Sequence, residues 1–479
     1  MAEHSVTVEN TLQTLLAEKK YSTIRDILVT MNPADIAAVF AGVEPEKLPL
    51  LFRLLPKELA AESFVEMDPE MQEALIRGLS DSELRQVMDE LYVDDAVDIV
   101  EEMPANVVQR ILAQSDPQMR KEINEILQYP ENSAGSVMTT EYVKLSPNMT
   151  VGDAILRIRR TGVDKETIYT CYVLENRMLV GTVSVKSLLL APSDLQTVDS
   201  IMESNLITVN THTDQEEVAK MMSKYNLLAI PVVDGDNRMV GIVTFDDAMD
   251  VMEDEVTEDM EIMAGMTPSD KTYLRSSPFD LFKHRIPWLA LLMVSATFTG
   301  LIISNFEHKL EALVCLTAFI PMLMDTGGNS GSQSSVTVIR ALSLNELEFR
   351  DLAKVIWKEI RTAVLCGAVL SVLCFGKVML VDHLILKTDG VDVLVALVIC
   401  LTMAVTVLCA KIVGCSLPML AKRLGFDPAV MASPFITTIV DALSLLVYFG
   451  FASALLPALR AGSSPILAQV FDWIRMIAQ

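Results

Sequence analysis

Residues 427–456 read DPAVMASPFITTIVDALSLLVYFGFASALL. The pair Asp427-Pro428 predicts the start of a helix, because an Asp side chain caps free N–H groups and a first-turn proline lacks only an N–H that has no partner. Beyond this pair, Asp441 is the only residue with a carboxylate or amine side chain. The stretch is long enough to cross a bilayer, which takes about 20 apolar residues. A charge near the middle of a membrane costs roughly 2.5 to 3.5 kcal/mol, so Asp441 needs compensation.

Polar residues recur at helical spacing around this carboxylate. Thr437 lies one turn before Asp441, Ser433 two turns before it, and Ser444 three residues after it. On a helix these residues share one face, while the remaining surface is compatible with lipid. The stripe predicts a path for cations. The alternative is a protonated Asp441 that is hydrogen-bonded to a neighbouring helix.

Charge divides the chain into two halves. The 479 residues carry a net charge of −25, with −27 on residues 1–280 and +2 on the remainder. This distribution argues against nucleic acid as a partner and favours divalent cations.

The N-terminal sequence MAEHSVTVEN and the cysteines indicate the compartment. The N-terminus lacks the basic and apolar regions of a signal peptide, so we expect the acidic half to lie in the cytosol. Six of the seven cysteines lie in apolar segments and no C-x-x-C pair occurs. This pattern predicts neither disulfides nor a zinc site.

Residues 1–130 show short leucine-rich helical patterns that are interrupted about every dozen residues. The interruptions are caps and first-turn prolines, at Pro33, Pro45, Pro56, Asp68-Pro69, Ser80-Asp81, Val93-Asp94, Pro104 and Asp116-Pro117. Each helix has an apolar face too small to be stable alone, which favours stacked helix pairs. We therefore expect an all-α superhelical N domain.

A weak internal repeat follows. Residues 137–155 align with 201–219, and residues 177–189 align with 238–249. Each copy predicts a helix, two strands joined by a turn, and a closing helix, as in a tandem of CBS domains, which the two copies (131–200 and 201–255) resemble. The second copy carries Thr244 and Asp247 in the [ST]-x-x-D pattern that holds a nucleotide ribose in that family, whereas the first copy lacks the acid. If a nucleotide such as ATP binds, we expect it in the second copy.

The segment after the repeat is strongly acidic, and we expect residues 256–281 to form a connecting helix. Seven acids crowd into twelve positions: Asp250, Glu253, Asp254, Glu255, Glu258, Asp259 and Glu261. Such a run is commonly a solvated helix face. However, like charges one helical turn apart repel, so a compact arrangement of these acids would need bound cations. Ligands that are all oxygen suit Mg²⁺ or Ca²⁺.

The second half, residues 282–479, contains five apolar segments, which predict an all-α domain with five membrane spans. The segments are about 286–304, 311–337, 360–381, 391–420 and 429–457. With the N-terminus inside, nine basic residues of the flanking loops fall on the cytosolic side and four fall outside, in accord with the positive-inside rule.

The second predicted span ends in a stretch that lipid would not tolerate. Small and polar residues from Gly327 to Gln333 follow Pro321 and Asp325, and they include Asn329. The stretch must face another helix or water. We interpret Pro321, Asp325, Asn329 and Gln333 as the mouth of a pore; a polar packing seam is the alternative.

Three motifs together resemble the MgtE family of magnesium channels and transporters: YPENSAGSVMTTEY (129–142), PMLMDTGGNSGSQSS (321–335) and DPAVMASPFITTIVD (427–441). The resemblance covers nearly the whole chain. It implies a homodimer in the cell membrane, with N-terminal domains in the cytosol and a pore on the two-fold axis that is lined by the second and fifth spans. It also implies that Mg²⁺ is both substrate and regulator, and that Asp441 selects the ion together with Thr437 and Ser433. Ser433 stands where some relatives have Asn, and Asn226 stands where an acid is common.

The resemblance also implies a cytosolic magnesium sensor made of acids from the N domain, the CBS domains and the connecting helix. The matching residues are Asp94, Asp95, Asp98, Glu216, Asp247, Asp250, Glu255, Glu258 and Asp259.

The alternatives are a membrane enzyme and a coupled carrier. The five histidines form no H-E-x-x-H motif and the chain has no phosphate-binding G-x-x-x-x-G-K-[ST] loop, so we expect no enzyme. A proton- or sodium-coupled carrier of divalent cations is the closer alternative. Carriers often show inverted repeats, and five unequal spans show none.

Overall fold

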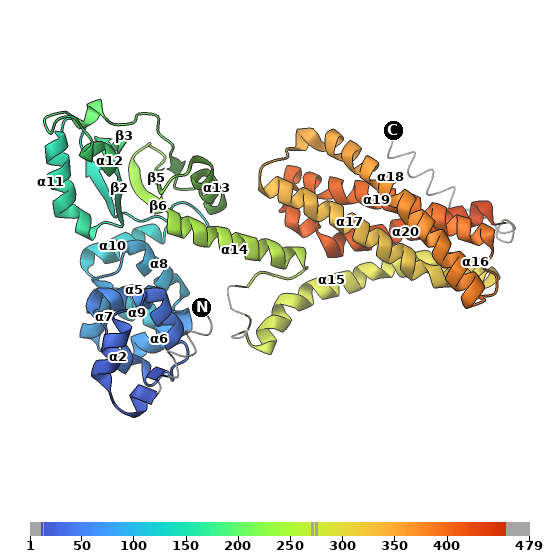
Figure 1. The fold of residues 1–479 in the computed structure, drawn as a ribbon, viewed down its shortest axis with the longest axis horizontal. Helices are drawn as coiled ribbons and strands as arrows, with labels where there is room; N and C mark the ends of the chain where they lie inside the picture. The colour runs from blue at the N-terminus through green and yellow to red at the C-terminus, as the bar shows by residue number, and fades with distance from the viewer. Residues whose placement is uncertain (1–10, 13, 270–272, 274–275, 457–479) are drawn as a thin grey trace. The chain divides into compact units, whose positions relative to one another are not determined.

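The computed structural model describes the chain except for residues 1–10, 13, 270–272, 274–275 and 457–479 (Figure 1). It divides into two compact units, residues 1–253 and residues 254–479. Each unit is described by itself below.

The first unit begins with a helical domain, as predicted. Its helices are α2 (Tyr21–Leu28), α3 (Pro33–Phe40), α4 (Leu48–Phe52), α5 (Lys57–Val65), α6 (Pro69–Gly78), α7 (Asp81–Met88), α8 (Val93–Glu102), α9 (Ala105–Gln114) and α10 (Pro117–Ile126). Most begin where the sequence predicted a start. Ser80 caps α7 in a capping box with Glu83, and prolines open α3, α6 and α10. Pro45 is the exception, because α4 begins only at Leu48.

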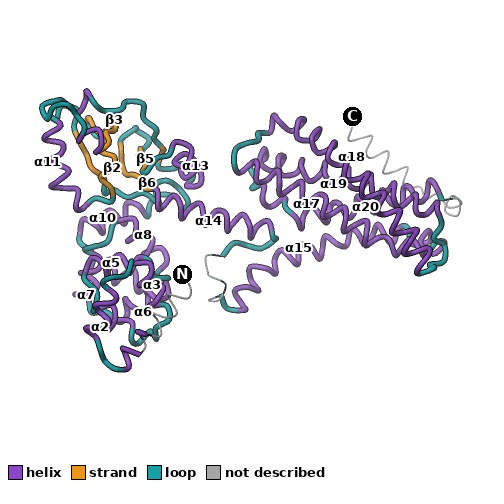
Figure 2. Tube along the Cα trace, viewed as in Figure 1, coloured by secondary structure: helices purple, strands orange, loops and turns teal. Residues whose placement is uncertain are grey.

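Two three-stranded sheets follow, and Figure 2 shows their strands. The first copy contains β1 (Tyr142–Leu145), α11 (Val151–Thr161), β2 (Thr167–Glu175), β3 (Met178–Ser184) and α12 (Val185–Leu189). The second contains β4 (Val209–Asn210), α13 (Gln215–Tyr225), β5 (Ala229–Val233), β6 (Met239–Thr244) and α14 (Phe245–Met263). In each sheet the first strand pairs parallel to the second, and the second pairs antiparallel to the third. The leading strands β1 and β4 were not predicted, since two to four residues are too few for a periodic pattern.

The two copies share a core. Tyr142, Tyr172 and Ile242 are buried together between the sheets, and the Tyr142 hydroxyl donates to the main-chain oxygen of Met239. The apolar core of the helical domain also continues into the second copy, where it includes Val218. This shared core supports the side chains of the acidic cluster described below.

Helix α14 is continuous over 19 residues. The boundary predicted between residues 255 and 256 falls inside it, so the connecting helix starts at Phe245, directly after β6. Between the end of α14 and Ser277 the described residues form no helix.

The second unit is a bundle of helices. These are α15 (Pro278–Asn305), α16 (Glu307–Ala312), the 3₁₀ helix η3 (Val314–Phe319), α17 (Ile320–Ser343), η4 (Phe349–Asp351), α18 (Leu352–Lys377), the π-helix η5 (Val378–Ile385), α19 (Val393–Leu424), the 3₁₀ helix η6 (Pro428–Met431) and α20 (Ser433–Leu455).

Four stretches of helix among the described residues are long and apolar enough to cross a membrane: 278–305, 349–385, 393–424 and 428–455. They coincide with four of the five predicted spans. The predicted second span, 311–337, is divided among α16, η3 and α17, and α17 is too polar to qualify. The count of five spans therefore stays a prediction.

At the helix start predicted for Asp427, the structure has a short 3₁₀ helix, and a break separates it from the long helix that follows. The Asp427 carboxylate accepts from the Ala429 N–H at 2.8 Å, and η6 ends before Ala432 has an extended backbone. Pro434 follows two residues later and cannot donate the main-chain hydrogen bond that would continue the helix. Helix α20 therefore begins anew at Ser433.

Glycines bring α17 close to α19 and α20. A Cβ at Gly414 would overlap the carbonyl oxygen of Gly331, and a Cβ at Gly331 would lie 2.8 Å from the Ile436 side chain. No larger residue fits at either glycine without separating the helices.

Candidate functional site

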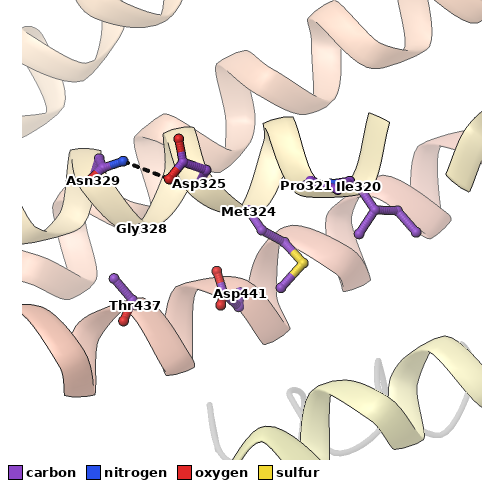
Figure 3. Close-up of a pocket in the computed structure, with 8 residues that line it drawn as sticks. All are labelled: Ile320, Pro321, Met324, Asp325, Gly328, Asn329, Thr437 and Asp441. Atoms are coloured by element: carbon purple, nitrogen blue, oxygen red, sulfur yellow. Dashed lines mark hydrogen bonds between the residues drawn. The ribbon is translucent and has the colours of Figure 1, made fainter. Parts of the chain in front are cut away.

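A pocket of about 410 Å³ opens between α17 and α20 (Figure 3). It combines two carboxylates, an amide and a hydroxyl with apolar side chains. The residues that line it are Ile320, Pro321, Met324, Asp325, Gly328, Asn329, Thr437 and Asp441. The pocket therefore brings together the polar stripes of the second and fifth predicted spans, which spacing along the chain defines one by one and which the family resemblance places along one pore.

The α17 side of the pocket is a stripe with helical spacing. Pro321, Asp325, Asn329 and Gln333 follow one another every four residues, and all four are exposed on this chain. The Asn329 amide donates to Asp325 Oδ1 at 3.1 Å (Figure 3). Gln333 is the one predicted mouth residue that does not line the pocket.

The α20 side supplies Asp441 and Thr437. The Asp441 side chain is half-buried, and no residue that the structure describes donates a hydrogen bond or forms an ion pair with it. The Thr437 hydroxyl donates to the Pro434 carbonyl at 2.9 Å, which leaves its oxygen free to accept. The side chain of Ser433 lies outside the described residues.

Gly328 sets the distance between the two stripes. A Cβ at this position would lie 2.9 Å from the Thr437 methyl group, so any larger residue would displace the threonine. Ile320, Met324 and Gly328 line the pocket but were not among the predicted site residues. Gly328 lies one turn after Asp325, Met324 directly precedes Asp325, and Ile320 lies one turn before Met324, so spacing along the helix was the available signal.

We expect Thr437→Val to lower magnesium flux about three- to tenfold, because it removes a hydroxyl from the pocket while keeping the shape of the side chain. Thr438 provides the matched control. Its hydroxyl donates to the same Pro434 carbonyl at 3.1 Å, but it does not line the pocket. Ion uptake by liposomes measures both variants, and equal losses in both would contradict a role for Thr437 in the pocket.

The first unit contains an acidic cluster where α8 faces the first turn of α14. The negative charge of Asp247 disfavours the charged form of three acids on α8, which are Asp94, Asp95 and Asp98. Glu166, which precedes β2, experiences repulsion from Asp95 and Asp247. Four of the predicted sensor acids thus lie together.

Burial and mutual repulsion both raise the pKa values in this cluster. Burial is the larger cause, followed by neighbouring acids, and together they raise the pKa of Asp95 to about 7 and that of Glu166 to about 8. The pKa of the buried Asp94 is raised well above its usual range. The pKa of Asp98 is also raised to about 7, but its side chain is exposed, so we expect solvent to reduce this shift.

Two carboxylate oxygens of the cluster lack hydrogen bonds. Asp94 Oδ1 and Glu166 Oε2 are buried, and neither has a hydrogen-bond partner among the described residues. A buried charge without a partner is costly, so the cluster needs a proton or a cation. Among the described residues no three acidic, histidine or cysteine side chains are grouped closely enough to hold a metal ion. Mg²⁺ usually keeps several waters and needs only one or two carboxylates, so these acids fit a hydrated ion.

The structure does not bring all the predicted sensor acids into this cluster. Glu216 forms an ion pair with Lys220, and Asp250 adds to the repulsion that acts on Asp247. Three acids of α14, Glu255, Glu258 and Asp259, belong to the second unit. There, the hydroxyl of Ser343, the last residue of α17, donates to Asp259 Oδ2 at 3.5 Å.

Glu141, Glu166 and Asp246 contribute to the cluster but were not predicted. Repulsion from Glu141 and Asp246 adds to the raised pKa of both Asp95 and Glu166. Glu166 and Glu141 are single acids without a local pattern. Asp246, however, is adjacent to the predicted Asp247 in the sequence, which was a signal.

The raised pKa values predict that, in the absence of magnesium, the cytosolic unit is more compact at low pH than at high pH. The compact form binds more protons than a form in which the acids are separated, so its stability is greatest at low pH. The stability is lost as the pH rises through about 6 for Asp247, 7 for Asp95 and 8 for Glu166. In full-length protein with a chelator, a fluorophore pair on α5 and α11 should be closer at about pH 5 than at about pH 8. Saturating magnesium should flatten this dependence, and a distance independent of pH in the chelator would contradict the prediction.

Thr244 and Asp247, the two residues predicted to hold a nucleotide ribose, are hydrogen-bonded to each other. The Thr244 hydroxyl donates to Asp247 Oδ2 at 2.5 Å, which fixes the carboxylate at the start of α14. Asp247 thus belongs both to the acidic cluster and to the candidate nucleotide site.

An acidic N-terminal unit and a bundle of apolar helices with a carboxylate in a polar pocket define a membrane transport protein for cations. Family models match the chain as a divalent cation transporter (residues 320–451), an MgtE intracellular N domain (31–132) and CBS domains (134–194 and 198–254). The magnesium transporter MgtE of Thermus thermophilus is 36% identical over 93% of this chain and 98% of its own length. That of Bacillus subtilis is 32% identical over 93% of this chain and 96% of its own length. The chain belongs to the MgtE family.

A crystal structure of the cytosolic domain of the Mg²⁺ channel MgtE in complex with ATP is 36% identical. It covers 51% of this chain and 99% of its own, with a TM-score of 0.48. Together with the apolar helices, family membership makes this chain a multi-pass membrane protein with cytosolic N-terminal domains.

Proposed function

We propose that this protein is a magnesium-selective channel, formed by two copies of the chain and closed by Mg²⁺ bound to the cytosolic acids. The pocket that joins Asp441 and Thr437 of α20 to Asp325 and Asn329 of α17 carries the proposal. The relatives that match over 93% of this chain are named magnesium transporters, which supports a transport function.

The polar stripe on α17 supports the homodimer. Asp325, Asn329 and Gln333 are exposed on a single chain, and such a surface does not face lipid. A second copy around a two-fold axis would cover the stripe and bring two Asp441 carboxylates to one path. Two carboxylates would hold a hydrated Mg²⁺ through its waters, since this ion gives up water reluctantly. Conduction needs binding weak enough for release.

The acidic cluster supports the gate. At high cytosolic magnesium, ions between α8 and the first turn of α14 would offset the repulsion and stabilise a compact, closed form. At low magnesium the acids would separate and the pore would open. Because each bound ion favours the same closed state, closure should be cooperative in magnesium. The Thr244–Asp247 pair supports ATP binding in the second CBS domain, where a nucleotide would influence the same acids.

Flux of Mg²⁺ through the purified full-length protein in liposomes tests the proposal. A channel gives a reversal potential that follows only the magnesium gradient. A proton- or sodium-coupled carrier, the second candidate, would shift that potential with the gradient of the coupling ion. Absence of any magnesium flux at low internal magnesium would overturn the proposed function.

A further inference from the structure

A second polar group of the membrane unit lies where α17, α18 and α19 meet. Lys411 of α19 is only 5% exposed, although it stands inside an apolar helix. Its Nζ donates to Ser334 Oγ of α17 at 3.2 Å and lies 3.8 Å from Glu359 Oε2 of α18. The Ser334 hydroxyl in turn donates to Glu359 Oε2 at 2.6 Å. We call these three residues the Lys411 network.

A contribution to stability alone does not explain the Lys411 network. Removing two charges from water costs about as much as their attraction returns, so apolar residues of similar size often serve as well. Within a membrane the two charges are costly and are commonly linked to function. The best attested use of a buried polar group is to fix one arrangement of helices among several.

Glycines form the contact between α17 and α19 next to the Lys411 network. Gly331 and Gly414 let α17 and α19 touch through their backbones, and a Cβ at Gly331 would lie 3.2 Å from the carbonyl oxygen of Ala410. A contact made by glycines is close, but it has no side chains that interlock against rotation. Ser334 lies three residues after Gly331 on the same face. Its hydrogen bonds therefore oppose rotation of α17 against α19 at this glycine contact.

A second anchor on α17 has a different partner. The Ser335 hydroxyl donates at 2.7 Å to the carbonyl of Met431 in η6. This bond ties α17 to the start of the α20 segment. It does not fix α17 against α18 and α19, which is the part of the bundle that the Lys411 network reaches.

We propose that Ser334, Glu359 and Lys411 are positioning residues that set the rotation of α17 and thereby the ion discrimination of the pore, without contact with the ion. The inference rests on the proposed function, because it assigns the network to the pocket on α17. Asp325 and Asn329 precede Ser334 on the same helix. A rotation of about 20° would move each Cα by about 0.8 Å at a helix radius of about 2.3 Å. Functional groups must be held within roughly 0.5 Å to keep their geometry.

The test is Ser334→Ala in the full-length protein in liposomes, with uptake of Mg²⁺ and of Ca²⁺ measured separately. The substitution leaves both charges in place and removes only the link to α17. We expect the ratio of Mg²⁺ to Ca²⁺ uptake to fall about tenfold, the factor that one hydrogen bond to a charged group can supply.

Ser371→Ala is the matched control. The Ser371 hydroxyl of α18 donates to the Cys400 carbonyl of α19 at 3.0 Å, so this variant also loses a hydrogen bond between helices but leaves α17 untouched. Its uptake ratio should equal that of the wild type. Equal falls in both variants, or no fall in Ser334→Ala, would overturn the inference.

A double variant guards against a Ser334→Ala protein that fails to assemble. Lys411→Met combined with Glu359→Leu removes both charges and leaves neither one alone, so we expect a folded protein with reduced discrimination. A wild-type ratio in the folded double variant would overturn the inference. If the wild type discriminates Mg²⁺ from Ca²⁺ and the variants keep its uptake ratio, only the role of the Lys411 network is refuted. Wild-type protein without magnesium uptake would refute the proposed function, and the inference with it.

Discussion

Replacement of Asp441 by Ala is expected to lower magnesium flux by at least roughly 100-fold. Two unit charges 4 Å apart attract by about 4 kcal/mol at an effective dielectric constant of about 20, and each 1.4 kcal/mol corresponds to about a factor of ten. The Asp441 carboxylate has no partner among the described residues of its own chain, so its charge is available to an ion. Asp441→Asn should be nearly as damaging, because it keeps the shape of the side chain but removes the charge.

The protein should still fold and assemble, since loss of a half-buried charge relieves a cost of desolvation. Asp389→Asn is the control, because Asp389 is an exposed acid in the loop between η5 and α19. Ion uptake by liposomes and size-exclusion chromatography together separate lost transport from lost assembly. Normal magnesium uptake by Asp441→Ala would exclude this carboxylate from the ion path.

The second large effect should follow from neutralising α8. We expect the triple substitution Asp94→Asn, Asp95→Asn and Asp98→Asn to abolish most of the magnesium dependence of the cytosolic unit. These acids repel Asp247 in the compact form. The amide side chains of the triple variant carry no charge. They would therefore remove both the repulsion of Asp247 and the carboxylates that could hold the cation. For the wild type, a hundredfold excess of ion over its dissociation constant contributes about 2.7 kcal/mol per site to the compact form.

Limited proteolysis of the full-length protein measures this effect. The wild type should be cut slowly with magnesium and rapidly without it, and potassium at equal ionic strength should protect much less, because screening acts on all charges alike. The triple variant should be cut at similar rates in all three conditions. Glu58→Gln and Glu62→Gln on α5, with Glu66→Gln directly after it, make the same change in charge on exposed positions and should keep the wild-type response. If potassium protects the wild type as well as magnesium does, the acids are an ordinary solvated surface.

The two polar stripes of the proposed ion path were predictable because a helix is a local structure. Thr437 and Asp441 share a face of α20 by their spacing alone, as Asp325 and Asn329 do on α17. The sequence could not show from spacing that the two stripes line one pocket, since they lie more than a hundred residues apart. Likewise, only the family resemblance predicted that the acids of α8 belong with Asp247. The structure adds Glu166, whose position before β2 carries no pattern in the sequence.

The Lys411 network shows a signal that was present but not used. Lys411 stands inside the predicted span 391–420, and Glu359 immediately precedes the span 360–381. A charge deep inside a predicted span suggests a partner on another helix, and here the partner is at the end of the neighbouring one. Identifying Ser334 as their link required the packing of three helices, which spacing along the chain does not encode.

The backbone contact between Gly331 and Gly414 also bears on how this gene can vary. Every single-nucleotide missense change of a glycine codon introduces a side chain, and at Gly414 even the smallest one would overlap the neighbouring carbonyl oxygen. In a library of random point mutants, this codon should therefore tolerate synonymous changes but almost no others. Its tolerance should match that of the Asp441 codon, although a glycine takes no part in binding the ion.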